Sequence, residues 1–229
     1  MKKFQKIVMF LVLAVFLVGG SAWASLLGVN LGNPDIFSNT NGSYNYNAVT
    51  NLFTSTASPF TITMQDGAQH HIYNGSYNVA FHVDESGSFS GSGFSAVNPT
   101  QTYDLEIYGT IDMDDNLNLT DPGDLTGLLV GGNVTAFGWE DSTYRTFDFT
   151  FDFLDGQLSS YYAMYNNNGG DIGFSEAPSV WDGNWENDHS GLNVKHDTAP
   201  VPEPATLLLL GSGLIGLAGI GRKKFFRKA

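Results

Sequence analysis

The stretch that decides the fold is TFDFTFDFL, residues 146–154, in which phenylalanine recurs at every second position. Side chains of a β-strand alternate between its two faces, so Phe147, Phe149, Phe151 and Phe153 lie together on one face. The aspartates and the threonine between them lie on the other face, where water solvates them. A helix would scatter the four rings around its circumference. The pattern therefore predicts a strand with one buried face.

The same period-two alternation marks Tyr103–Met113 and Tyr77–Val83. Shorter runs of strand character cover residues 45–54, 60–64, 88–96, 125–130 and 133–139. Asp155-Gly156 is a typical hairpin turn, and it separates the phenylalanine-rich strand from residues 158–165, which we expect to form a strand rather than a helix. Short strands with such turns predict an all-β fold, a single antiparallel β-sandwich or barrel-like domain.

The N-terminal 24 residues have the three parts of a secretory signal peptide. Lysines at positions 2, 3 and 6 precede an unbroken apolar run, Ile7–Val18. Ala22-Trp23-Ala24 then forms an A-x-A cleavage site, with Ala22 and Ala24 as its small residues. We therefore expect a signal helix that engages the secretory translocon and is removed by signal peptidase after Ala24.

The C-terminal residues predict a short transmembrane helix. Ala205–Gly221 carry no charge, and at about 1.5 Å per helical residue they reach about 25 Å, the lower limit for crossing a bilayer. Five basic residues follow this segment, and such clusters stay on the cytoplasmic side. Prolines just upstream prevent the helix from extending toward the domain.

A Pro-Glu-Pro triplet, an apolar helix and a basic cluster occur here in that order. The residues concerned are Pro202, Glu203, Pro204, Arg222, Lys223 and Lys224. This tail resembles the PEP-CTERM sorting signal of Gram-negative bacteria. The resemblance implies that an exosortase, a membrane transpeptidase, recognises the tail and that the tail is removed during delivery to the surface. It also implies an association with exopolysaccharide and biofilm functions, and a precursor that is transiently anchored in the inner membrane.

The predicted domains follow from these two ends. Residues 1–24 are the signal peptide, 25–181 the β-rich exported domain, 182–200 a polar linker and 201–229 the sorting signal. Residues 30–46, rich in Asn, Gly and Ser, and the Asn-Asn-Asn-Gly-Gly run at 166–170 are expected to be loops. Each end is thus expected to serve in delivery, and the middle to fold.

The charge of the exported part limits its partners. Residues 25–200 contain two basic residues, Arg145 and Lys195, against 22 acidic ones, a formal net charge of −20. Such a surface repels nucleic acids and anionic lipids but attracts cations. The chain has no cysteine, which excludes disulfides, a thiol nucleophile and a cysteine-ligated metal.

The densest polar cluster suggests a calcium site. Its six residues are Asp112, Asp114, Asn116, Asn118, Asp121 and Asp124. The first four have the alternate spacing that begins an EF-hand loop, but the sixth loop position is Leu117 instead of Gly and the twelfth is Gly123 instead of Glu. The alternative interpretation is a solvated strand face followed by a turn. Calcium is the one cofactor that the sequence suggests.

Aromatic residues beside polar ones suggest a platform for sugar rings. Trp181, Trp185 and Tyr162 have amide and carboxylate neighbours that could bind sugar hydroxyl groups. The alternative interpretation is that these rings pack in the core of the domain, as Trp and Tyr usually do.

No catalytic residue is predicted, because the chain has no G-x-S-x-G nucleophile elbow and no zinc-type histidine spacing. The sequence therefore favours a non-enzymatic cell-surface or extracellular-matrix protein, structural or adhesive in an exopolysaccharide biofilm. Two alternatives stay open: a carbohydrate-binding module of that matrix, and a secreted glycan-processing enzyme.

Overall fold

The structure is a computed structural model of the whole chain. It describes residues 27, 29–39, 41–93, 101–139, 146–175 and 184–201. The predicted signal peptide and the sorting tail beyond Val201 lie outside these residues. Within them, no helix has both the length and the apolar character needed to cross a membrane.

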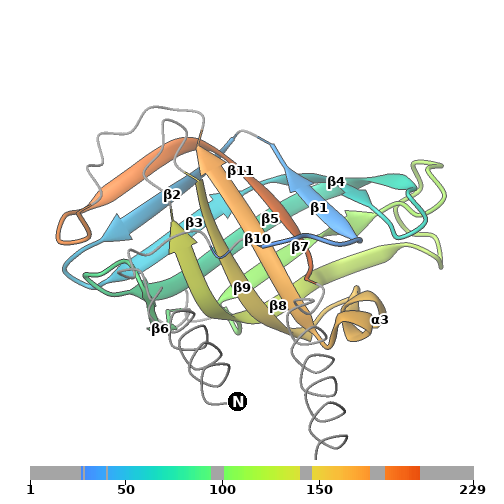
Figure 1. Ribbon diagram of the computed structural model, residues 1–229. Coiled ribbons are helices and arrows are strands. Elements are labelled where there is room, and N and C mark those ends of the chain that lie inside the picture. The colour runs from blue at the N-terminus through green and yellow to red at the C-terminus, as the bar shows by residue number, and fades with distance from the viewer. Residues whose placement is uncertain are drawn as a thin grey trace, which may run out of the picture.

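Strands make up most of the described chain, as Figure 1 shows. They are β1 (Asp35–Ser38), β2 (Gly42–Asn47), β3 (Leu52–Ala57), β4 (Pro59–Thr63), β5 (Gln69–Val83), β6 (Phe89–Ser92), β7 (Leu105–Ile111), β8 (Leu125–Trp139), β9 (Thr146–Asp155), β10 (Asn168–Ser175) and β11 (His189–Pro200). One short helix, α3 (Ser159–Tyr162), and a 3₁₀ turn, η1 (Ala163–Tyr165), connect β9 to β10.

The strands close into an eight-stranded antiparallel barrel. Around the ring the order is β5-β3-β2-β11-β10-β9-β8-β7, and β7 pairs with β5 again to close the sheet. β4 follows β3 along β5, and β1 follows β2 along β11, so each pair acts as one long interrupted strand. The all-β prediction is confirmed, and ring closure shows a barrel instead of a sandwich.

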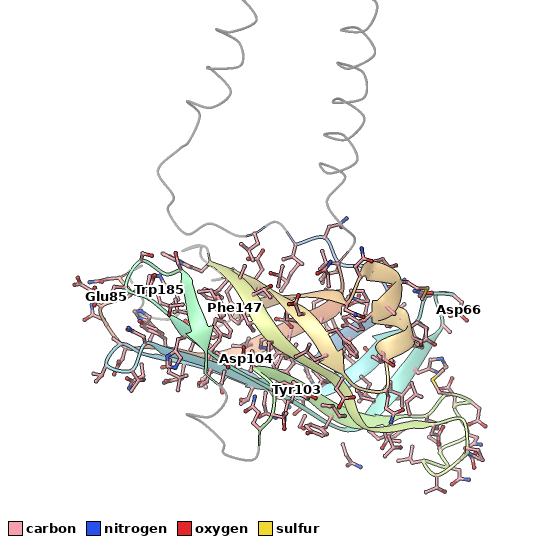
Figure 2. All side chains as sticks on the ribbon, turned by 90° about the horizontal axis from the view of Figure 1, so that it is seen from below. Asp66, Glu85, Tyr103, Asp104, Phe147 and Trp185 are labelled. Atoms are coloured by element: carbon pink, nitrogen blue, oxygen red, sulfur yellow. The ribbon has the colours of Figure 1, made fainter. Side chains whose placement is uncertain are left out.

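Aromatic side chains fill the interior of the barrel. The Phe53 ring centroid lies 5.0 Å from that of Phe81 and 5.1 Å from that of Phe147. All four phenylalanines of the predicted strand are buried, which confirms the alternation read in residues 146–154. Figure 2 shows the side chains on the ribbon, with Phe147 labelled among those of β9. The interior is a packed hydrophobic core of the kind that stabilises small barrels.

Two glycines of β10 make room for these rings. A Cβ on Gly169 would lie 2.2 Å from Phe151 Cζ, and one on Gly173 would lie 2.3 Å from Phe147 Cζ. The two positions flank Asp171, which also faces inward and is fully buried. β10 therefore supplies space and one carboxylate to the interior instead of bulky apolar groups.

The two ends of the barrel carry different connections between strands. The tail end, as we name it, is the end where β11 reaches Pro200. It also carries the turn 64–68 between β4 and β5, the connection 112–124 between β7 and β8, and the α3 connection. The far end carries the turns 48–51 and 84–88. In Figure 2, Asp66 marks the tail end and Glu85 the far end.

The predicted polar linker is wrong for residues 189–200, which form β11. This strand pairs with β10 on one side and with β2 and β1 on the other, so the domain extends to Pro200 and not to residue 181. Its inward positions include histidine, glycine and threonine as well as valine. The strand therefore lacks the alternation of apolar and polar residues by which a strand is predicted from sequence.

Other local predictions also fail. Residues 30–46 contain β1 and all but the last residue of β2, and the predicted loop at 166–170 contains the start of β10. Residues 159–165, expected as a strand, form α3 and η1. Leu158 and Tyr162 from this connection are completely buried, so the short helix covers the tail end of the core. Tertiary burial here outweighs the local strand preference.

Candidate functional site

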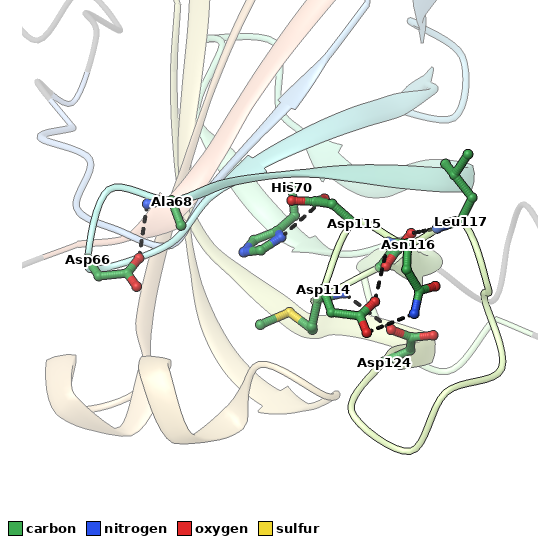
Figure 3. A network of polar contacts seen from close by, with 10 residues as sticks. Asp66, Ala68, His70, Asp114, Asp115, Asn116, Leu117 and Asp124 are labelled. Carbon is green, nitrogen blue, oxygen red and sulfur yellow. Dashed lines mark hydrogen bonds and ion pairs between the residues drawn. The ribbon is translucent and has the colours of Figure 1, made fainter.

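The acidic loop, residues 112–124, connects β7 to β8 at the tail end of the barrel. One carboxylate oxygen from each of Asp112, Asp114 and Asp124 lies within 4.8 Å of the others. Asp112 directly follows β7 and Asp124 directly precedes β8, so the pairing of these two strands brings the carboxylates together. Figure 3 shows Asp114 and Asp124 close together in this loop.

The backbone of the acidic loop is left-handed at two residues that are not glycine, one of them at the sixth loop position. The Leu117 N–H donates to Asp112 Oδ2 over 2.8 Å. Asp115 and Leu117 have positive φ angles of 56° and 68°. Leu117 therefore adopts the conformation that a glycine usually provides at the sixth position, so the absence of glycine does not prevent the turn.

The other predicted ligands hold the loop together through their side chains. Asn116 Nδ2 donates to Asp114 Oδ2 over 2.8 Å and to Asp121 Oδ2 over 2.6 Å. Asn118 Nδ2 donates to Asp121 Oδ1 over 2.5 Å. The structure thus brings three of the six predicted residues into one carboxylate cluster and places the other three around it.

The carboxyl groups of the cluster influence each other. Burial raises the pKa of Asp114, and the hydrogen bond that it shares with Asp112 raises it further. Burial opposes ionisation of Asp112 too, but hydrogen bonds from Leu117 N–H and other donors of the loop outweigh it and lower the pKa of Asp112. The closeness of the two carboxyl groups therefore opposes the ionisation of Asp114.

A second polar cluster lies inside the barrel and was not predicted. His196 Nδ1 lies 2.8 Å from Asp171 Oδ1, and His196 Nε2 lies 2.8 Å from Ser55 Oγ. Thr198 Oγ1 donates to Asp171 Oδ2 over 2.5 Å. The cluster joins β3, β10 and β11. Along the sequence, His196 is 141 residues from Ser55 and 25 residues from Asp171, so no local motif could indicate the cluster.

The interior cluster has the order of a Ser-His-Asp triad but not the setting that catalysis requires. Ser55 and His196 are each only 1% exposed. The Ser55 hydroxyl donates to Ser43 O over 2.9 Å, so its proton does not point at the imidazole. The Tyr77 ring stacks on His196 with centroids 4.0 Å apart. The arrangement fixes three strands together and leaves no room for a substrate at Ser55.

The pKa of Tyr77 is shifted by its buried position beside Asp171. Burial holds the pKa of its hydroxyl well above the usual range, and the negative charge of the nearby Asp171 raises it further. The tyrosine therefore stays protonated, and it cannot act as a base near neutral pH.

The predicted sugar platform is wrong for the two of its residues that the structure describes. Trp185 is 3% exposed and packs edge-on against Tyr46, with ring centroids 4.8 Å apart. Tyr162 is fully buried and stacks on Phe153 at 4.5 Å. Rings whose faces are covered by the core cannot stack on sugars. The third residue, Trp181, lies outside the described residues.

The N-terminal segment and the sorting tail meet at the tail end. Gly32 N–H donates to Pro200 O over 2.8 Å, and Val201 N–H donates to Asn168 O over 3.0 Å. Val29 and Val201 both lie against Gly170, where a Cβ would lie 2.4 Å from the first and 2.6 Å from the second. Hydrogen-bonded barrel structure therefore continues to Val201, next to Pro202.

Fold and tail together define a class: a closed β-barrel domain joined directly to a C-terminal sorting tail. Residues 200–223 match the family model described as the PEP-CTERM protein-sorting motif, which confirms the resemblance inferred from the sequence. The motif indicates an exported protein that is processed at the membrane by an exosortase. No curated protein and no solved structure matches the chain.

A pair of carboxyl groups lies across the pairing of β1 and β11. Asp35 and Asp197 each have a buried Oδ1 without a hydrogen-bond partner. Burial raises the pKa of Asp197 to about 8, and the hydrogen bond and the negative charge of Asp35 contribute to the rise. The Asp197 carboxyl is therefore mostly protonated at neutral pH.

Replacing His196 by alanine should destabilise the barrel strongly. The change leaves the buried Asp171 Oδ1 without its hydrogen-bond partner, a loss that costs about 1–3 kcal/mol for a buried polar atom. The free energy of unfolding, measured with urea, should fall by this order. His71→Ala, on an exposed part of β5, is the control and should change stability by less than about 0.5 kcal/mol. Equal stabilities of the two variants would contradict a structural role for the interior cluster.

Stability should depend on pH through Asp197. Its pKa rises from 3.8 in the unfolded chain to about 8 in the folded one. The stabilising contribution of the protonated form is therefore complete below about pH 4 and is lost as the pH rises to about 8. The Tm of the wild type should fall between pH 5 and pH 8 by more than the Tm of Asp197→Asn. Asp66 lies in an exposed turn, and the Tm of Asp66→Asn should fall over this pH range by as much as that of the wild type. Parallel curves for all three proteins would refute this.

Proposed function

We propose that the chain is a non-enzymatic protein of the cell surface or extracellular matrix, and that the barrel is the part that works outside the cell. The observation that carries this proposal is the direct junction between barrel and motif. The family match begins at Pro200, which is also the last residue of β11. Processing of the tail would therefore release a closed barrel and little else.

The position of the junction sets the direction in which the barrel is presented. Before processing, the apolar part of the tail anchors the precursor in the inner membrane, so the tail end of the barrel faces that membrane. The far end, with turns 48–51 and 84–88, points away from it. Val49 is 91% exposed in the first of these turns. The far end is thus the surface that meets partners first.

The proposed structural or adhesive role in an exopolysaccharide matrix is compatible with the charge of the exported part if divalent cations bridge the two. The exported part has a net charge of −20, which keeps the barrel soluble among anionic polymers and requires divalent cations for close contact with them. Binding sugars by stacking on Trp185 or Tyr162 is not part of this role, because both rings are buried. Contact with anionic polymers through bridging divalent cations therefore fits the described surface better than a sugar-binding pocket does.

The absence of turnover is part of the proposal. Ser55 has the neighbours of a hydrolase nucleophile, but its hydroxyl is buried and donates to a backbone carbonyl. Catalysis needs a nucleophile that a substrate can reach and a base that accepts its proton. The interior cluster supports a role in stability instead.

Replacing Pro202-Glu203-Pro204 by three alanines should block sorting. The variant should accumulate as an unprocessed, membrane-associated chain, because the exosortase no longer recognises the tail. Fractionation and mass spectrometry of the native host would measure this. Glu85→Ala, at the far end of the barrel, removes one glutamate outside the motif and should be released as the wild type is. Normal release of the triple-alanine protein would contradict the proposal that an exosortase sorts this chain through the Pro-Glu-Pro motif.

A fluorophosphonate probe, which modifies reactive serines, should leave Ser55 unlabelled. The expected result is the same background for wild type, Ser55→Ala and Ser190→Ala, a serine exposed on β11. Peptide mass spectrometry would locate any adduct. Labelling that disappears in Ser55→Ala and persists in Ser190→Ala would show a reactive serine and would contradict the non-enzymatic role.

A further inference from the structure

We propose that the acidic loop binds one Ca²⁺ ion through the carboxylates of Asp112, Asp114 and Asp124. All three ligands come from the ends of two neighbouring strands. Asp112 and Asp114 follow β7, and Asp124 precedes β8. One oxygen from each lies within 4.8 Å of the others, close enough for a single cation to contact all three.

The burial of Asp112 is an independent sign of a ligand. This side chain is only 1% exposed, and its Oδ1 is a buried atom without a hydrogen-bond partner. The other oxygen, Oδ2, accepts the Leu117 N–H. A buried carboxylate oxygen without a partner costs free energy unless a cation or another donor reaches it. A cation held by the carboxylate cluster would contact this same carboxyl group.

The chemistry of the cluster selects a hard cation. Its ligands are carboxylate oxygens, and the nearby His70 Nδ1 contacts Asp115 Oδ1 at 3.5 Å instead of joining the cluster (Figure 3). Oxygen-only ligands on a loop suit Ca²⁺, which accepts six to eight oxygens in flexible geometry. Zinc prefers nitrogen and sulfur ligands, and Mg²⁺ demands a stricter octahedron.

Binding would stabilise the barrel at the tail end. β7 and β8 are neighbours in the closed ring, and the loop between them is held by hydrogen bonds among its own side chains. A cation that joins Asp112 to Asp124 ties the end of one strand to the start of the next. Calcium would thus take the place of the disulfides that this chain, without cysteine, lacks.

Calorimetric titration of the full chain in detergent micelles with CaCl₂ tests the site. We expect one ion per chain with a Kd of about 0.1–1 mM, as in other extracellular calcium modules. In about 10 mM CaCl₂ the Tm should rise by several degrees over an EDTA sample. Asp112→Asn and Asp124→Asn should each weaken binding at least about tenfold and remove the Tm shift. Asparagine keeps the shape of aspartate and one acceptor oxygen, which at position 112 can still accept the Leu117 N–H. Both Asp124 oxygens accept backbone N–H groups, so Asp112→Asn is the decisive variant.

Asp115→Asn is the matched control. It removes one negative charge from the same loop, and Asn accepts the positive φ of this position. This variant should bind calcium and respond in Tm nearly as the wild type does. Two results would overturn the proposal: no heat and no Tm shift in the wild type, or a loss in Asp115→Asn equal to that in Asp112→Asn. The second would mean that only the general charge of the loop attracts cations.

Discussion

Closure of the barrel by β11 is the constraint on which the rest of the structure depends. This strand pairs with β10 along its C-terminal half and with β2 and β1 on its other side. Without it the sheet would have two open edges and the aromatic interior would be exposed to water. The cluster of Ser55, His196 and Asp171 crosses this closure, so three strands share one buried set of hydrogen bonds.

The same feature explains which parts of the fold could be predicted from the sequence. The phenylalanine-rich strand and Tyr77–Val83 have apolar residues at every second position, so the sequence alone predicts which of their faces is buried. β11 directs His196 and Thr198 inward, and β10 directs glycines and Asp171 inward. Their polar groups are satisfied by each other, which only the three-dimensional structure shows. Both segments therefore looked like loops or a linker.

The candidate sites divide in the same way. The spacing of Asp112, Asp114 and Asn116 is a local pattern, so the acidic loop could be found in the sequence. Asp124 joins it because β7 and β8 pair, which spacing alone did not establish. The interior cluster joins residues far apart in the chain and could not be found. Trp185 looked like a surface ring because of its polar neighbours, but tertiary packing buries it.

The closing strand also determines how the domain relates to its sorting signal. Because β11 ends at Pro200, the motif follows the barrel without a linker, and both segments at the ends of the described chain lie at the tail end. The strand that closes the barrel thus leads directly into the sorting motif.

Hydrogen–deuterium exchange of the full chain, read by mass spectrometry, tests the closing role of β11 most directly. Amides of residues 189–200 should exchange as slowly as those of residues 147–153 in the phenylalanine-rich strand, because both segments lie inside the closed ring. Exchange of 189–200 at the rate of an unprotected chain, with 147–153 still protected, would show a linker there and would contradict the closed barrel.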